Sequence, residues 1–151
     1  MKNLYEAGRA QEVKERLARL KADSPRQWGS MNAAQAVAHC SAGLEWAVGD
    51  KTPDPMWFLP RMIGRVIKPL ALGDDKPMKR NSPTAKSLII KDDRVLEIER
   101  TRLNELVDRF VAGGKVGCTT EQHPFFGKLT PDEWAILIYK HLDHHLRQFG
   151  V

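Results

Sequence analysis

The sequence predicts an all-α protein, a four-helix bundle with a long crossover between its second and third main helices. Apolar residues recur at helical spacing in several segments, and helix start and stop signals flank those segments. The stretch 51–93 shows no comparably long pattern and therefore reads as a connection. At 151 residues the chain has the length of one domain, so we expect a single unit over residues 1–151.

The first two predicted helices cover residues 6–22 and 31–48. In the first, apolar residues form one stripe among charges, which is typical of a surface helix. In the second, Ser30 is the expected N-cap and Gly49 the stop signal. This second helix is rich in alanine, so a facing helix can approach it closely.

The crossover is expected to hold one or two short apolar helices and then loop or extended chain. A third main helix is predicted over residues 95–111, where leucine, valine and phenylalanine form a core stripe before Gly113 and Gly114 end it.

The final helix has the clearest start in the sequence. Thr130 is a favourable N-cap, Pro131 suits the first helical position, and Glu133 is the acidic partner of a capping box. We expect this helix to run to about Phe149.

Composition excludes some function classes. The net charge of +5 favours acidic partners, but no nucleic-acid-binding motif accompanies it, so nucleic-acid binding is not expected. No apolar run is long enough for a membrane span, and residues 1–23 lack the pattern of a secretory signal. We therefore expect a soluble, cytoplasmic protein that does not interact with membranes.

Three of the five histidines lie in the final helix, within YKHLDHHLRQFG. His141 and His145 are four residues apart and share a stripe with Trp134 and Ile138, so both rings are expected to point into the core. That spacing is typical of a two-nitrogen metal clasp. An alternative stays open, because a helix C-terminus favours imidazolium by about 0.3 to 1 kcal/mol without any ligand.

A metal site of this kind usually takes three protein ligands. His39 is the better candidate for the third, because it lies in the middle of the second helix on a stripe of small residues. His123 lies before the final helix, and about 11 helical residues at 1.5 Å each place His141 roughly 16 Å from that end. The alternative reading of His39 is an ordinary core histidine.

Several neighbours of these histidines are candidate accessory residues. Gln148 shares the stripe of His145 and is a candidate to bond a ligand ring or simply to cap the helix. His123 in HPFFGKL is a candidate pocket residue on a loop that covers the pocket as a lid. The alternative is a structural loop whose phenylalanines plug the end of the bundle. Cys40 reads as inert packing. Leu142 follows His141, so the H-E-x-x-H pattern of metalloproteases is absent.

The motifs AHC, HPFFGKL and HLDHHLRQFG together resemble the DinB superfamily, and more narrowly an uncharacterised DinB-like subfamily with an HP-x-FG-x-L stretch and a terminal H-x-x-H-H-x-x-Q-F. The helix order extends the resemblance over nearly the whole chain. It implies a four-helix bundle with a divalent metal bound by His39, His141 and His145. Characterised relatives include transferases that use a low-molecular-weight thiol, while this subfamily has no established reaction.

The leading hypothesis is therefore a metal-binding protein, with zinc or nickel as the expected ion, that activates water or a low-molecular-weight thiol for group transfer or detoxification of a small-molecule substrate. The alternative is a non-catalytic helical interaction module, with a role in stress as one option, that has no functional metal site. The apolar stretch 53–67 is a candidate cover for a pocket or a homodimer surface.

Overall fold

The computed structural model describes residues 1–54 and 58–151, and this part of the chain consists of helices and loops. The helices are α1 (Arg9–Arg19), α2 (Ala33–Ala47), α3 (Phe58–Leu72), α4 (Leu96–Gly113) and α5 (Pro131–Gln148), with a short 3-10 helix η1 (Lys86–Leu88) before α4. The all-α prediction is confirmed. The expected count of four main helices is wrong, because α3 is a 15-residue helix inside the predicted crossover.

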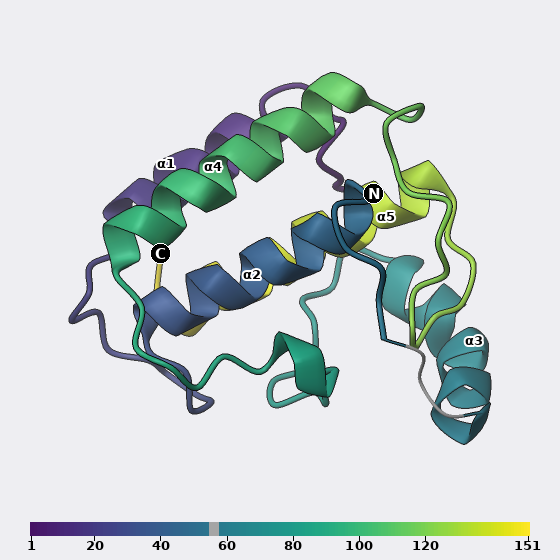
Figure 1. The fold of residues 1–151 in the computed structure, drawn as a ribbon, viewed down its shortest axis with the longest axis horizontal. Helices are drawn as coiled ribbons and strands as arrows, with labels where there is room; N and C mark the ends of the chain where they lie inside the picture. Colours follow the sequence, from purple (N-terminus) through teal and green to yellow (C-terminus); the bar gives the residue numbers. More distant parts are fainter. Residues whose placement is uncertain (55–57) are drawn as a thin grey trace.

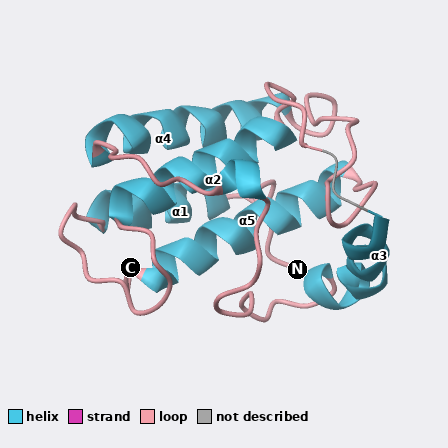
Figure 2. Cartoon of the chain, turned by 60° about the horizontal axis from the view of Figure 1, so that its bottom comes forward, coloured by secondary structure: helices cyan, strands magenta, loops and turns pink. Residues whose placement is uncertain are grey.

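The helices α1, α2, α4 and α5 pack against one another around one hydrophobic core. In Figure 1, α1 and α4 lie side by side above α2 and α5. The helix α3 projects at one end of the molecule, where its only helix neighbour in the described chain is α5. Long loops join the helices at both ends, as Figure 2 shows.

The start of α2 differs from the prediction by two residues. Asn32, not Ser30, is the N-cap: its side chain accepts a hydrogen bond from the backbone N–H of Gln35, whose side chain accepts one in return from the backbone N–H of Asn32. This reciprocal pair satisfies two N–H groups that a lone serine would not. It fixes the start of the helix that carries His39.

The start of α5 agrees with the prediction. Thr130 and Glu133 form the expected capping box, and Pro131 is the first helical residue. Trp134 and Ile138 are buried, at 1% and 3% exposure, so the stripe that also carries His141 faces the core. None of the described helices is both long and apolar enough to cross a membrane.

The helix α3 turns apolar residues outward. Its exposed stripe consists of Met62, Ile63, Val66, Ile67 and Leu70, with Val66 79% exposed. The opposite side packs on the turn before α5. The expected apolar surface over residues 53–67 coincides with the start of this helix, although residues 55–57 lie outside the described chain.

At that turn, a Cβ on Gly64 would lie only 1.9 Å from the carbonyl oxygen of Phe125, so the contact needs glycine. Lys68 pairs with Glu133 at 2.7 Å and donates to the carbonyl of Lys128 at 3.1 Å. These contacts hold the basic side of α3 against the protein.

Candidate metal centre

The structure brings three of the five histidines together. His39 comes from α2, and His141 and His145 come from α5, one helical turn apart. One ring nitrogen from each lies within 4.8 Å of the other two. His39 is buried at 2% exposure, whereas His141 and His145 keep part of their surface accessible. The cluster therefore has a closed inner side and an accessible outer side.

A backbone carbonyl of the crossover fixes the ring of His39. Its Nδ1 lies 2.7 Å from the carbonyl oxygen of Leu88, which ends η1. A carbonyl oxygen can only accept, so Nδ1 carries the proton and donates it. Nε2 of His39 therefore presents a lone pair to the cluster, which is the tautomer that metal coordination requires.

Gln148 does the same for His145. The side-chain nitrogen Nε2 of Gln148 donates to the carbonyl oxygen of Trp28 at 2.7 Å, so its Oε1 faces His145. Nδ1 of His145 lies 2.8 Å from that Oε1 and must be the donor. Nε2 of His145 is then also free of a proton. The loop that carries Trp28 thus orients one ring of the cluster through a single buried amide.

The three rings form a triangle, with each pair of ring centroids 4.8 Å apart, and His141 contacts His39 directly. Its Nε2 is 2.9 Å from Nε2 of His39, which has no proton, so His141 donates this hydrogen bond in the absence of a cation. Gly43 of α2 faces the ring, and a Cβ at that position would make an ordinary contact of 3.6 Å with Cε1 of His141. A cation in the cluster would replace this hydrogen bond and shift the His141 proton to Nδ1.

The environment keeps all three imidazoles neutral. Burial lowers the pKa of His39 and, with a smaller contribution from the neighbouring histidines, lowers the pKa of His141 well below its usual value. Burial also lowers the pKa of His145 to about 3. Neutral imidazole is the form that binds a metal ion, so the cluster needs no deprotonation near pH 7.

The dimensions and donor types fit one divalent ion. Three nitrogens bound tetrahedrally to one zinc ion by bonds of about 2.1 Å lie about 3.4 Å apart. Pairs up to 4.8 Å apart must therefore close by at most about 1.4 Å, and the 2.9 Å pair of His39 and His141 must open by about 0.5 Å. The cluster contains no carboxylate within the described ranges. Three nitrogen donors of this kind suit zinc, nickel, copper or iron.

The family described as "Protein of unknown function (DUF1569)" matches residues 4–150 of the chain. The chain belongs to this family. No curated protein and no solved structure matches it. Nothing in these comparisons names a reaction for the DUF1569 family, so its chemistry has to be inferred from the site itself.

In this DUF1569 chain His123 does not join the three-histidine cluster. Its Nδ1 accepts hydrogen bonds from the backbone N–H groups of Phe125 and Phe126 at 3.2 and 3.1 Å. Its ring packs between Trp46 and Trp134. Phe126 is buried and Phe125 is partly buried against the core, which is the packing that the structural alternative for HPFFGKL expects of its two phenylalanines.

His144 and Cys40, which neighbour two of the clustered histidines, also stay outside the cluster. The ring of His144 lies against Trp28, with centroids 5.4 Å apart, on another side of α5. Cys40 is buried, and burial raises the pKa of its thiol, so it is inert packing as expected.

Sequence reasoning missed the groups that orient the site from outside the helices. The carbonyls of Leu88 and Trp28 hold His39 and Gln148, and a backbone carbonyl has no signature in sequence. The contact between Gly43 and His141 did have a signal, because Gly43 lies four residues after His39 in a helix of small residues.

Proposed function

We propose that this chain is a DinB-like protein that binds a divalent metal ion through His39, His141 and His145. The observation that carries the proposal is the convergence of three neutral imidazoles whose nitrogens lie within 4.8 Å of one another. Two of the three have their Nδ1 protons donated away from the cluster. Burying polar ring nitrogens without full hydrogen bonding costs free energy, and a bound cation would offset that cost.

The proposed reaction class is group transfer to a low-molecular-weight thiol, or hydrolysis, of a small electrophilic substrate. A divalent ion held by three neutral ligands keeps its full double charge and would lower the pKa of a thiol or water beside it. In the transfer, a carbon–sulfur bond forms, the bond to the leaving group breaks with its electron pair, and the thiol proton passes to water. Zinc or nickel is the proposed ion.

The residues around the cluster would orient the metal ligands rather than transfer protons. Leu88 and Gln148 hold two rings in the binding tautomer, and the accessible sides of His141 and His145 leave a small molecule a route to the cluster. No carboxylate base belongs to the cluster in the described part of the chain. A thiol is therefore a better substrate than an alcohol, because its proton leaves more easily.

The test is a transfer assay on tag-free protein loaded with zinc or nickel. Common cellular thiols are mixed with 1-chloro-2,4-dinitrobenzene, and chloride release with thioether formation is followed. We expect turnover that needs the metal and is lost in His141→Ala but kept in His144→Ala, which changes the adjacent histidine. Turnover that is equal in all three proteins would reject the assignment of the site.

A second candidate function, a non-catalytic interaction module that forms homodimers, has one observation in its favour. The exposed apolar stripe of α3 is unusual for a monomer surface. Sedimentation of wild type and Val66→Asp tests it: a dimer that the aspartate dissociates supports the module, and a monomer at high protein concentration rejects the homodimer. A homodimer through α3 is compatible with metal binding, because α3 contributes no ligand to the cluster, whereas a module without a functional metal site is an alternative to the enzyme.

A further inference from the structure

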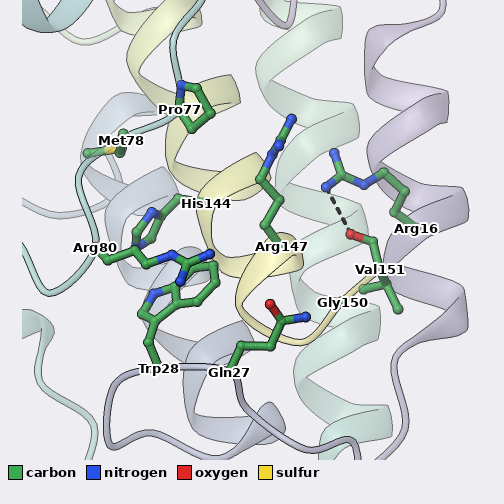
Figure 3. A pocket seen from close by; sticks show the side chains of 10 residues that line it. All are labelled: Arg16, Gln27, Trp28, Pro77, Met78, Arg80, His144, Arg147, Gly150 and Val151. Atoms are coloured by element: carbon green, nitrogen blue, oxygen red, sulfur yellow. Dashed lines mark hydrogen bonds between the residues drawn. The ribbon is translucent and has the colours of Figure 1, made fainter.

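A concave site lies on a neighbouring face of α5: His144 lines it, and the ring centroid of His144 is 5.1 Å from that of His145 in the cluster. It is a pocket of about 620 Å³ at the C-terminal ends of α1 and α5, within the size range of small-molecule sites. The loop before α2 and the crossover segment 77–80 form its other walls (Figure 3). None of the three clustered histidines lines it, so its occupancy does not depend on the proposed metal.

Positive charge exceeds negative charge around this pocket. Arg16, Arg80 and Arg147 line it. One carboxylate, that of Asp143, is shared by Arg16 and Arg147, each at 2.7 Å. Glu12 lies 3.8 Å from Arg16 but bonds Arg9 more closely, at 2.7 Å. Arg9 also pairs with Glu6, at 3.0 Å, so Glu12 is shared between Arg9 and Arg16. Of the three lining arginines, Arg80 alone has no carboxylate partner in the described chain.

Arg80 is therefore the uncompensated charge of the pocket. Its described contact is with the indole of Trp28, with Cζ 4.2 Å from the ring centroid. A guanidinium on an aromatic face keeps its N–H donors at the edge, where they can bind an oxyanion in bidentate fashion. In Figure 3, Arg80 lies over Trp28, and Arg147 extends from α5 with its guanidinium away from that of Arg80. Arg80 therefore offers donors to a ligand beside Trp28, and Arg147 offers donors at another part of the same pocket.

Beside the arginines, the lining combines two aromatic rings and apolar side chains with the amide of Gln27. Trp28 and His144 place two rings against one another, with an interplanar angle of 58°. Pro77 and Met78 cover the same region from the crossover. Such a surface favours the body of an organic molecule, and a bare inorganic ion would leave it unused.

We propose that this pocket binds a small organic oxyanion, a molecule with a flat apolar body and a carboxylate, sulfonate or phosphate group. The oxyanion accepts from the guanidinium group of Arg80, and the body lies against Trp28 and His144. Arg147 adds positive charge at another part of the same pocket. The proposal does not depend on the metal function.

The experiment is calorimetric titration of chelator-treated full-length protein with naphthalene-2-sulfonate, which stays charged at all working pH values. We expect one saturable site, and binding about tenfold or more weaker in Arg80→Gln, since it loses a charge-assisted hydrogen bond, with a smaller loss in Arg147→Gln. Arg19→Gln is the matched control, because Arg19 is an exposed α1 residue that does not line the pocket. It should bind like wild type.

Two further probes separate the two parts of the ligand. Naphthalene-2-methanol has the same rings without the charge, and inorganic phosphate has the charge without the rings; both should bind at least about tenfold more weakly. Equal binding of the neutral alcohol, equal loss in Arg19→Gln, or no saturable binding of the sulfonate would each overturn the proposal. Circular dichroism of each variant confirms that it is folded.

Discussion

Nδ1 of His145 donates a hydrogen bond to Oε1 of Gln148 at 2.8 Å, and the same amide donates to the carbonyl of Trp28 at 2.7 Å. Gln148 is almost fully buried, at 2% exposure. A buried amide with both ends satisfied is rigid, so it holds the ring of His145 in one orientation and one tautomer.

Replacing Gln148 by leucine should therefore weaken zinc binding by about 10- to 100-fold, because the ring loses its orienting acceptor. Gln148→Glu should lose less, since a carboxylate still accepts from Nδ1 of His145. Competition with a fluorescent zinc chelator measures both affinities. Equal affinity in wild type and Gln148→Leu would show that the amide does not orient the site.

Gly43 gives a second prediction, about the space beside His141. A Cβ at this position meets Cε1 of His141 at 3.6 Å, an ordinary contact. Gly43→Ala should keep zinc binding and raise the free energy of unfolding by about 0.5 to 1 kcal/mol, because glycine weakens a helix interior. Urea unfolding measures that gain.

Gly43→Leu is the matched larger substitution. Its side chain overlaps the position of the His141 ring, so zinc affinity should fall by about tenfold or more as the ligand is displaced. A leucine variant that binds zinc like the alanine variant would contradict the placement of His141 against α2.

The third prediction concerns pH and His123, whose pKa burial lowers from its ordinary 6.5 to about 4. As pH falls below 6.5, the unfolded chain takes up this proton first and the folded protein does not, so stability present above pH 6.5 is lost toward pH 4. From about pH 7.5 to pH 5, this group alone should lower the free energy of unfolding by about 2 kcal/mol.

His123→Asn is the control for that loss. The asparagine oxygen can accept from the N–H groups of Phe125 and Phe126, as Nδ1 of His123 does, but it does not titrate in this range. Urea unfolding of metal-free protein at several pH values should show a smaller acid loss in this variant. Identical pH profiles would mean that His123 is not buried as a neutral ring.

Local signals in the sequence predicted the parts of the fold that local interactions determine. Thr130 and Glu133 cap α5 because their partners are three residues away, and His141 and His145 share a face because the helix repeats every 3.6 residues. The same logic identifies Asn32 and Gln35 as the cap of α2, a signal that the choice of Ser30 overlooked.

The sequence did not predict contacts between residues that are far apart in the chain. The return of η1 to put the carbonyl of Leu88 against His39 depends on how the crossover folds over α2, and no side-chain pattern encodes it. The crossover was expected to hold one or two short helices, whereas α3 is 15 residues long and contains Gly64 and Pro69. Its glycine is instead a contact point for the turn at Phe125, which stabilises the helix from outside.

The central claim is that three histidines from two helices hold one divalent ion. Its most direct test is metal content, measured by mass spectrometry after tag-free protein is dialysed against buffered zinc or nickel. We expect about one ion per chain in wild type and in His144→Ala, and a loss of affinity of about tenfold or more in His39→Ala, His141→Ala and His145→Ala. Wild-type protein that holds no ion after loading, or a loss in His144→Ala as large as in His39→Ala, would contradict it.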